Sequence, residues 1–297
     1  MNRYNETAID DDLLLQRGAD AQRPSIENLV AFQWNAEPDS LAYRKATRRD
    51  RVVLDWLAGA ITTRPAAALD VGCAYGTHLL MLNARLNCDP LVRLVGVDLY
   101  DGALAYGRDF AARVNGYENV RFEVADIENG LPFEDDAFSA VNLADVLEHL
   151  ENPVAALDEL RRVTRPGGTI VVSTPLRDSL FKQLARSLNG VAKGRLYKAY
   201  YAGKSADLND QGNPVMVTHA GHDHISEMTL PELRDVVTRA RLEVHDMHLM
   251  PIMNGSAWFD RHPFILSAIT LVEAIHEIAQ RPSWAHAVCL RLVVPAT

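Results

Sequence analysis

Residues Leu69-Asp-Val-Gly-Cys-Ala-Tyr-Gly76 join a short apolar run, which begins at Ala66, to a segment with leucines at helical spacing. The apolar run predicts a buried strand, and the leucine spacing predicts a helix after it. Glycines in such a turn let the backbone approach a ligand closely, and the N–H groups of the helix then point toward that ligand. The turn therefore predicts a ligand site, but turns of this kind open many different nucleotide-binding folds.

The chain after this turn alternates between predicted strands and helices. Asn152-Pro153 predicts a helix start, and Arg165-Pro-Gly-Gly168 predicts the end of that helix. Strands that alternate with helices favour a parallel, doubly wound sheet with right-handed crossovers. The predicted strands cover 66–71, 91–98, 120–124, 137–145 and 169–174, and the helices between them cover 79–86, 101–114 and 152–163.

Two further acids stand where predicted strands end. Asp98 closes the second strand, and an acid at that position can accept hydrogen bonds from both hydroxyls of a ribose. Asp126, followed by Ile127, comes after the third strand, where an acid and the backbone can hold an adenine edge. Ligands of this fold class bind at the carboxyl ends of the strands, so these acids predict a site for a ligand that contains a nucleoside.

The same order continues with Asp145-Val-Leu-Glu-His149 after the fourth strand and Arg165-Pro-Gly-Gly168 before the fifth. In this order and strand context, residues 66–176 resemble the class I S-adenosylmethionine-dependent methyltransferases. The G-x-G-x-x-G fingerprint of nicotinamide-binding folds is absent. The resemblance implies S-adenosylmethionine as methyl donor and a pocket with Asp70, Gly72, Cys73 and Gly76 at the methionine end, Asp98 and Leu99 at the ribose, and Asp126 and Ile127 at the adenine.

Pattern and resemblance together predict an α/β fold: a doubly wound, Rossmann-like seven-stranded sheet whose last strand is antiparallel. We expect an acidic leader and a helical cap over 1–62, a cofactor-binding half over 63–176, and a substrate-side half with an inserted basic lid over 177–297. In the last part, Thr229-Leu-Pro-Glu232 is a capping box that predicts a helix start. A strand over 242–250, a helix over 263–280 and a strand over 287–294 complete the predicted order.

Acidic and imidazole side chains gather in two segments on the predicted substrate side. Asp145, Glu148 and His149 follow the fourth strand, and His224 stands five residues before Thr229. This pattern is similar to that of small-RNA 2′-O-methyltransferases and ubiquinone-pathway O-methyltransferases, except that Asp145 replaces a Glu. Acids and imidazoles together suit a divalent cation, so one prediction is a metal held by all four residues. The other is a metal-free site in which His224 acts as base or pocket wall, with His149 and Asp145 as further catalytic candidates.

Residues 177–204 carry seven Lys and Arg residues against a single acid, and tyrosines are interleaved among them. One interpretation is a lid that attracts an acceptor bearing a phosphate or carboxylate. The other is a solvated amphipathic helix pair whose tyrosines pack beneath it. The sequence leaves both interpretations open.

The composition excludes several classes of protein. With 48% hydrophobic and 23% charged residues, the 297-residue chain is a folded globular protein rather than a disordered one. Its 3 cysteines are too few and too far apart for a disulfide scaffold or a zinc cluster. A net charge of −9 disfavours general binding of nucleic acid. Because neither a signal peptide nor a membrane span is recognisable, we expect a cytoplasmic protein.

The resemblance, together with the substrate-side residues, implies methyl transfer to an oxygen of a small or carrier-bound metabolite, such as a sugar, a lipid or a quinone-like ring. RNA 2′-O-methylation is an alternative, supported by the substrate-side pattern and opposed by the net acidity. A third possibility is a partner subunit that binds the cofactor without catalysing transfer. The fold alone does not identify the acceptor.

Overall fold

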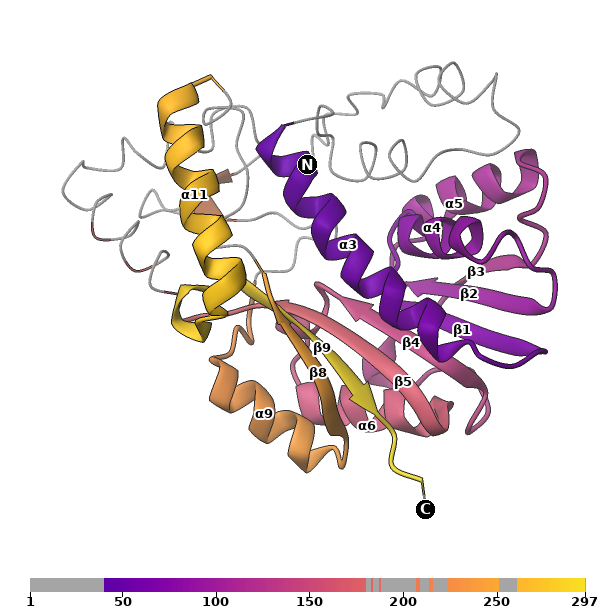
Figure 1. The fold of residues 1–297 in the computed structure, drawn as a ribbon. Coiled ribbons are helices and arrows are strands. Elements are labelled where there is room, and N and C mark those ends of the chain that lie inside the picture. The colour runs from indigo at the N-terminus through magenta and orange to yellow at the C-terminus, as the bar shows by residue number, and fades with distance from the viewer. Residues whose placement is uncertain are drawn as a thin grey trace.

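The computed structural model describes residues 40–179, 224–250 and 261–296, together with 183, 187, 207–208 and 214–215. At its centre is a seven-stranded sheet in the order β3-β2-β1-β4-β5-β9-β8 (Figure 1). Strand β9 runs antiparallel to both of its neighbours. The predicted doubly wound sheet with an antiparallel last strand is therefore confirmed. Residues 1–39, which include the predicted leader and the start of the predicted cap, lie outside the described residues, as do residues 180–182, 184–186 and 188–204 of the predicted lid.

The strands and helices follow the predicted alternation. The strands of the main sheet are β1 (Ala66–Val71), β2 (Val92–Asp98), β3 (Val120–Val124), β4 (Phe138–Ala144), β5 (Thr164–Pro175), β8 (Glu243–Leu249) and β9 (Ala287–Val293). The helices are α3 (Leu41–Ala60), α4 (Thr77–Arg85), α5 (Asp101–Arg113), α6 (Pro153–Val163), α9 (Leu230–Arg239) and α11 (Pro263–Ala279). Short 3-10 turns η1 (Ile127–Asn129), η2 (Leu147–His149) and η3 (Pro282–Trp284) and a two-stranded pair, β6 (Asp207–Leu208) and β7 (Pro214–Val215), complete the elements.

Strand β5 begins earlier than the sequence predicts. Thr164 already pairs with Phe138 of β4, and Thr169 pairs with Ala140, so the four residues between Thr164 and Thr169 bulge out of the ladder. Gly167 takes a φ of 71° in this bulge, a conformation that glycine adopts without a steric penalty. The Pro-Gly-Gly segment therefore interrupts the strand pairing rather than preceding it.

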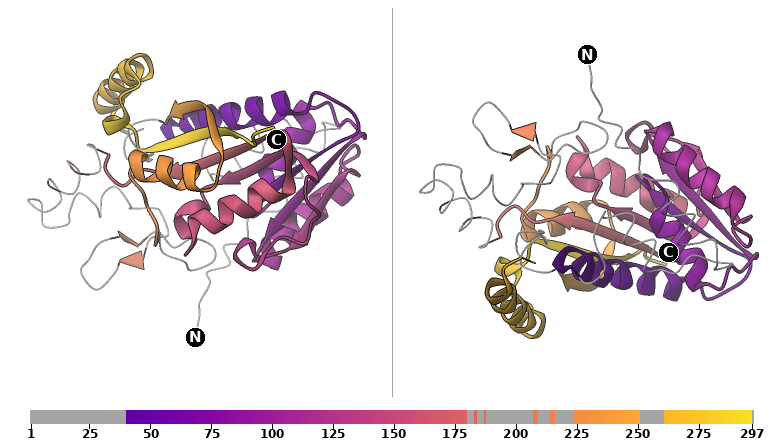
Figure 2. Two further views of the ribbon diagram at one scale, coloured as in Figure 1. Left: turned by 90° about the horizontal axis from the view of Figure 1, so that it is seen from below. Right: turned by 90° about the horizontal axis from the view of Figure 1, so that it is seen from above.

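Each face of the sheet has its own hydrophobic core. Helices α3, α4 and α5 cover one face, and α6 and α9 cover the other (Figure 2). Alternate residues of β5 show the division: Ile170 and Val172 pack in the core with α6 and α9, whereas Val171 packs with α3 and α4. Because helices cover both faces of the sheet, most side chains of the central strands are buried, and most of them are apolar. The ends of these strands are therefore left to carry the polar groups.

Helix α3 lies across the sheet and contacts β4, β5 and β9 as well as α4 (Figure 1). Its buried apolar residues lie at positions 41, 46, 53, 54 and 57, and the last four recur at helical spacing. The Ser40 side chain caps its first turn by accepting from the Tyr43 N–H at 3.0 Å. This helix confirms the helical segment expected before residue 62 and places it against the core.

Helix α11 stands apart from the sheet (Figure 1). Several of its large apolar residues are exposed, Phe264 to 91% and Ile278 to 87%. An ion pair between Lys45 and Glu273 links it to α3. None of the helices in the described part of the chain has both the length and the apolar character needed to cross a bilayer.

Candidate active site

The turn after β1 depends on two glycines with positive φ. Gly72 has a φ of 69° and Gly76 a φ of 77°. A Cβ on Gly72 would lie 2.2 Å from Val146 Cγ2, and a Cβ on Gly76 would lie 2.2 Å from Phe122 Cε1. The turn is thus packed too closely for any side chain at either position. Because Val146 belongs to the segment after β4, the same contact brings two ligand-facing turns together.

Asp70 is a buried carboxylate, and only one of its two oxygens accepts a hydrogen bond from the described residues. Its Oδ1 accepts from Asn142 Nδ2 at 2.7 Å, and its Oδ2 is buried without a hydrogen-bond partner among the described residues. Burial raises the pKa of Asp70 to about 6, because His78 and Asn142 only partly offset the lost hydration. A buried carboxylate oxygen with unused acceptor capacity suits a ligand that carries an ammonium group.

Asp98, at the end of β2, holds two neighbouring turns together. Its Oδ2 accepts from the Ala74 N–H at 2.8 Å, and its Oδ1 accepts from the Tyr100 N–H at 2.9 Å. Each carboxylate oxygen keeps lone-pair capacity for a further donor. The carboxylate is therefore placed between the glycine turn and the start of α5.

The remaining residues that the resemblance assigned to the cofactor differ in environment. Asp126 accepts from the Glu128 N–H at 2.9 Å and from Asn129 Nδ2 at 2.6 Å, so it shapes the η1 turn. Ile127 is buried in the core, whereas Leu99 is 53% exposed. Cys73 is buried, and burial raises the pKa of its thiol well above the ordinary value, which disfavours the reactive thiolate form.

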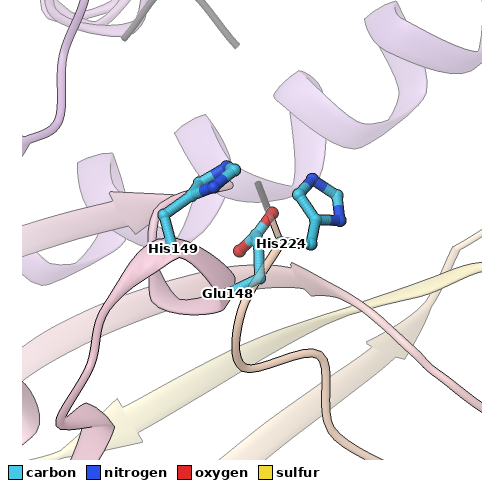
Figure 3. Close-up of side chains that lie close together, drawn as sticks. All are labelled: Glu148, His149 and His224. Carbon is cyan, nitrogen blue, oxygen red and sulfur yellow. The ribbon is translucent and has the colours of Figure 1, made fainter. Parts of the chain in front are cut away.

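Three of the four predicted substrate-side residues come together. The ligand atoms of Glu148, His149 and His224 all lie within 4.8 Å of one another. The two imidazole rings meet edge to face with centroids 4.8 Å apart. Figure 3 shows the Glu148 carboxylate beside both rings. We call these three residues the acceptor cluster.

Glu148 is the buried member of the acceptor cluster, with 1% of its surface exposed. Thr174 donates to its Oε2 at 3.0 Å. Burial, together with the nearby charge of Asp145, raises the pKa of Glu148 to about 8. A carboxyl group in this environment is held neutral unless a positive charge is placed beside it.

His224 reaches the acceptor cluster because Ser226 fastens its loop to η2. The Ser226 N–H donates to the Glu148 carbonyl at 3.0 Å, and its hydroxyl lies 2.9 Å from the Leu147 carbonyl and 3.0 Å from the Leu150 carbonyl. Three residues later the predicted capping box of Thr229 and Glu232 begins α9. His224 Nδ1 lies 2.9 Å from Glu227 Oε1, so the Glu227 carboxylate orients the imidazole ring.

Asp145, the fourth predicted member, is not part of the acceptor cluster. It forms an ion pair with Arg49 of α3, and its Oδ1 accepts from the Ser173 hydroxyl at 3.3 Å. Its backbone has a φ of 56°, in the left-handed region. The structure thus joins Asp145 to the N-terminal helix. The sequence pattern had instead grouped it with Glu148, His149 and His224.

A model of the methyltransferase domain family matches residues 63–215, which is more than half of the chain. The chain belongs to the class I S-adenosylmethionine-dependent methyltransferases. The match covers the glycine turn, Asp98, Asp126 and two of the three residues of the acceptor cluster. S-adenosylmethionine is therefore the methyl donor, as the sequence predicts.

Two curated relatives act in quinone biosynthesis by their names. A ubiquinone/menaquinone biosynthesis C-methyltransferase from Geobacter sulfurreducens is 37% identical over 119 residues, which are 39% of this chain and 45% of that protein. A demethylmenaquinone methyltransferase from Clavibacter sepedonicus is 36% identical over 145 residues, which are 46% of this chain and 56% of that protein. This methyltransferase thus spans about half the length of these relatives.

Solved structures resemble the methyltransferase in fold. The [4+2]-cyclase SpnF matches with a TM-score of 0.55 and 17% identity over 89% of this chain and 86% of that chain. Geranyl diphosphate methyltransferase in complex with GPP and sinefungin matches with a TM-score of 0.53 and 15% identity over 85% of this chain and 80% of that chain. At these identities the likeness shows the fold alone, and the acceptor has to be argued from the site.

Sequence reasoning missed four polar residues that the structure places beside the site: Arg49, Asp50, His78 and Asn142. All four are buried. One signal was present, because Arg49 and Asp50 interrupt the apolar spacing that runs from position 46 to position 57 of α3. Charged residues on the buried side of a helix need partners, and these partners are distant in sequence.

We predict that the Asp98 carboxylate holds the ribose of the methyltransferase's cofactor. Asp98→Ala should weaken binding of S-adenosylhomocysteine by about 1–3 kcal/mol, because buried hydroxyls lose a charged acceptor. Asp98→Asn keeps one acceptor oxygen and should lose less. Calorimetric titration of the folded variants measures both, and equal affinity of Asp98→Ala and the wild type would contradict the assignment.

A second prediction uses the raised pKa of Asp70, which is about 6. An ammonium group prefers the ionised carboxylate, so S-adenosylhomocysteine affinity should be constant above that pKa and fall as the pH drops below it. At pH 5 only about one tenth of the carboxylate is ionised in the free protein, so binding should be about tenfold weaker than at pH 7.5. Asp70→Asn should bind weakly with no such step. A pH-independent affinity in the wild type would refute the role of Asp70.

Proposed function

We propose that this methyltransferase transfers a methyl group to an oxygen of a hydroxyl-bearing small or carrier-bound acceptor, at the acceptor cluster. The observation that supports the proposal is the meeting of Glu148, His149 and His224 directly after the β4 turn. That turn contacts the turn after β1, residues 70–76, through Val146 and Gly72. We call residues 70–76 the cofactor turn. An acceptor bound beside the two imidazoles would therefore lie next to the methionine end of the cofactor pocket.

The chemistry required is a displacement at the sulfonium methyl. The acceptor oxygen forms a bond to the methyl carbon as the bond from carbon to sulfur breaks, and S-adenosylhomocysteine leaves. Alignment of oxygen, carbon and sulfur supplies much of the acceleration. A hydroxyl must also lose its proton, and an imidazole titrates in the range where it can accept one.

His224 is the better placed of the two histidines to act as the base. Its Nδ1 lies 2.9 Å from Glu227 Oε1, and a carboxylate at that place orients the ring and stabilises the imidazolium that forms when the ring accepts a proton. His149 lies edge to face against it and positions the ring. Glu148 contributes the buried carboxyl group of the cluster.

The same residues fit a divalent cation. Glu148 offers a carboxylate oxygen, and His149 and His224 each offer a ring nitrogen, with Glu227 orienting His224 in the way that carboxylates orient metal-bound histidines. A bound cation would lower the pKa of the acceptor hydroxyl. A mixed set of nitrogen and oxygen ligands favours Mn²⁺, Co²⁺ or Zn²⁺ over Mg²⁺.

Carbon methylation of a quinone-like ring is the second candidate, favoured by the name of the Geobacter sulfurreducens relative, which is a C-methyltransferase. Loss of a proton from a ring hydroxyl also makes the neighbouring ring carbon nucleophilic, so the same base serves both outcomes. RNA 2′-O-methylation and a cofactor-binding subunit without activity are the remaining alternatives. The net charge of −9 disfavours RNA.

A labelled-methyl assay tests the proposal. The protein is incubated with S-adenosylmethionine carrying a ¹³C methyl group and, in separate reactions, with reduced naphthoquinone, catechol, sugar, lipid and small-RNA acceptors, and the product is analysed by carbon NMR. We expect an oxygen-bound methyl group on a hydroxyl-bearing small molecule. A carbon-bound methyl would select the second candidate, methylated RNA would select the third, and binding of cofactor without transfer to any acceptor would indicate the inactive subunit.

The base and the cation make different predictions for the same assay. His224→Ala should slow methyl transfer by about 10²–10⁴-fold and leave S-adenosylhomocysteine affinity unchanged. His245→Ala, which removes an exposed histidine of β8, is the matched control. Without a metal, transfer survives exhaustive chelation; with one, chelation abolishes transfer and elemental analysis finds the ion. Full activity of His224→Ala would exclude both roles for this residue.

A further inference from the structure

A charged pair on α3 lies inside the protein, next to both turns of the active site. Arg49 is 8% exposed and Asp50 is 1% exposed. Arg49 Nε and Nη2 donate to Asp50 Oδ1 at 3.3 and 3.2 Å, and Nη1 donates to Asp145 Oδ2. The guanidinium thus joins α3 to the turn after β4.

Further polar contacts lead from Asp50 toward the cofactor turn. Asp50 Oδ1 lies 3.1 Å from His78 Nε2, in the first turn of α4. His78 Nδ1 lies 3.4 Å from Asn142 Nδ2, which donates to Asp70 at 2.7 Å. A continuous run of polar contacts therefore connects Asp145, after β4, with Asp70, at the end of β1.

Asp145, the residue of this series that follows β4, is held by hydrogen bonds and by an ion pair. Asp145 has a φ of 56°, in the left-handed region, which aspartate adopts more readily than most residues but still at a cost in free energy. Its N–H donates to the Ser173 carbonyl at 2.8 Å, and its carboxylate forms an ion pair with Arg49. The next residue, Val146, then packs into the space left by Gly72, and Glu148 and His149 follow in η2.

We propose that Arg49 and Asp50 are positioning residues, which hold the acceptor cluster and the cofactor turn in register by binding Asp145 and, through His78 and Asn142, Asp70. The proposal rests on the proposed function, since it takes the acceptor cluster as the place where the acceptor binds. Both residues are buried and lie outside the acceptor cluster. Their effect passes through the two turns that they fix.

A purely structural role for Arg49 would give a different result. In that case a variant would lower stability and leave the site as it is in every molecule that folds. A positioning role changes the site within the folded protein. The discriminating measurements are therefore cofactor affinity and the environment of the two imidazoles, each taken on protein shown to be folded by cooperative thermal unfolding.

The experiment compares Arg49→Gln, Arg49→Lys and the control Arg51→Gln, an exposed arginine on the same helix. Calorimetry measures S-adenosylhomocysteine affinity. Proton–nitrogen NMR of protein with ¹⁵N-labelled histidine follows His149 and His224, whose signals are assigned from single His→Gln variants. Arg49→Gln should weaken binding about tenfold or more, as expected for loss of charged hydrogen bonds, and shift both imidazole signals. The cofactor affinity and the imidazole signals of Arg49→Lys should lie between those of Arg49→Gln and the wild type, because an ammonium lacks the planar fork that reaches two carboxylates.

Arg51→Gln should match the wild type in both measurements. If Arg49→Gln does not fold, Arg49→Lys decides by the same criteria. A folded Arg49 variant with the affinity and imidazole signals of Arg51→Gln would overturn the proposal. Neither measurement needs an acceptor, so this result is independent of whether the proposed methyl transfer is observed.

Discussion

The contact between Gly72 and Val146 is the constraint on which the site depends. A Cβ at position 72 would lie 2.2 Å from Val146 Cγ2, so the turn after β1 and the turn after β4 can meet only because one of them has no side chain there. Parallel pairing of β1 with β4 sets both turns at the same edge of the sheet. The contact between the turns then places the acceptor cluster beside the cofactor turn.

The electrostatics of this edge suit a cationic cofactor. Four carboxyl groups, from Asp70, Asp98, Asp145 and Glu148, lie at the ends of three neighbouring strands. S-adenosylmethionine brings a sulfonium and an ammonium, and Asp70 and Asp98, which are fixed before it binds, need little rearrangement to stabilise these charges. Arg49 compensates Asp145, and the raised pKa of Glu148 keeps that group from adding another buried charge.

Local patterns predicted the parts of the fold and site that depend on local order. The Asp70 to Gly76 turn, Asp98 and the capping box at Thr229 were recognisable because strand, turn and helix signals lie within a few residues of one another. The partner of Asp145 was not recognisable, because Arg49 is 96 positions away and no local periodicity links them. The attachment of His224 through Ser226 was hidden for the same reason.

A structure with S-adenosylhomocysteine bound tests the central claim most directly, because that claim concerns which groups face the transferred methyl. We expect the ligand's ammonium within hydrogen-bond distance of Asp70 Oδ2 and its ribose hydroxyls on Asp98. Its sulfur should face the space bordered by Glu148, His149 and His224. A ligand whose sulfur points away from these three residues, or whose ammonium binds elsewhere, would contradict the assignment of both sides of the site.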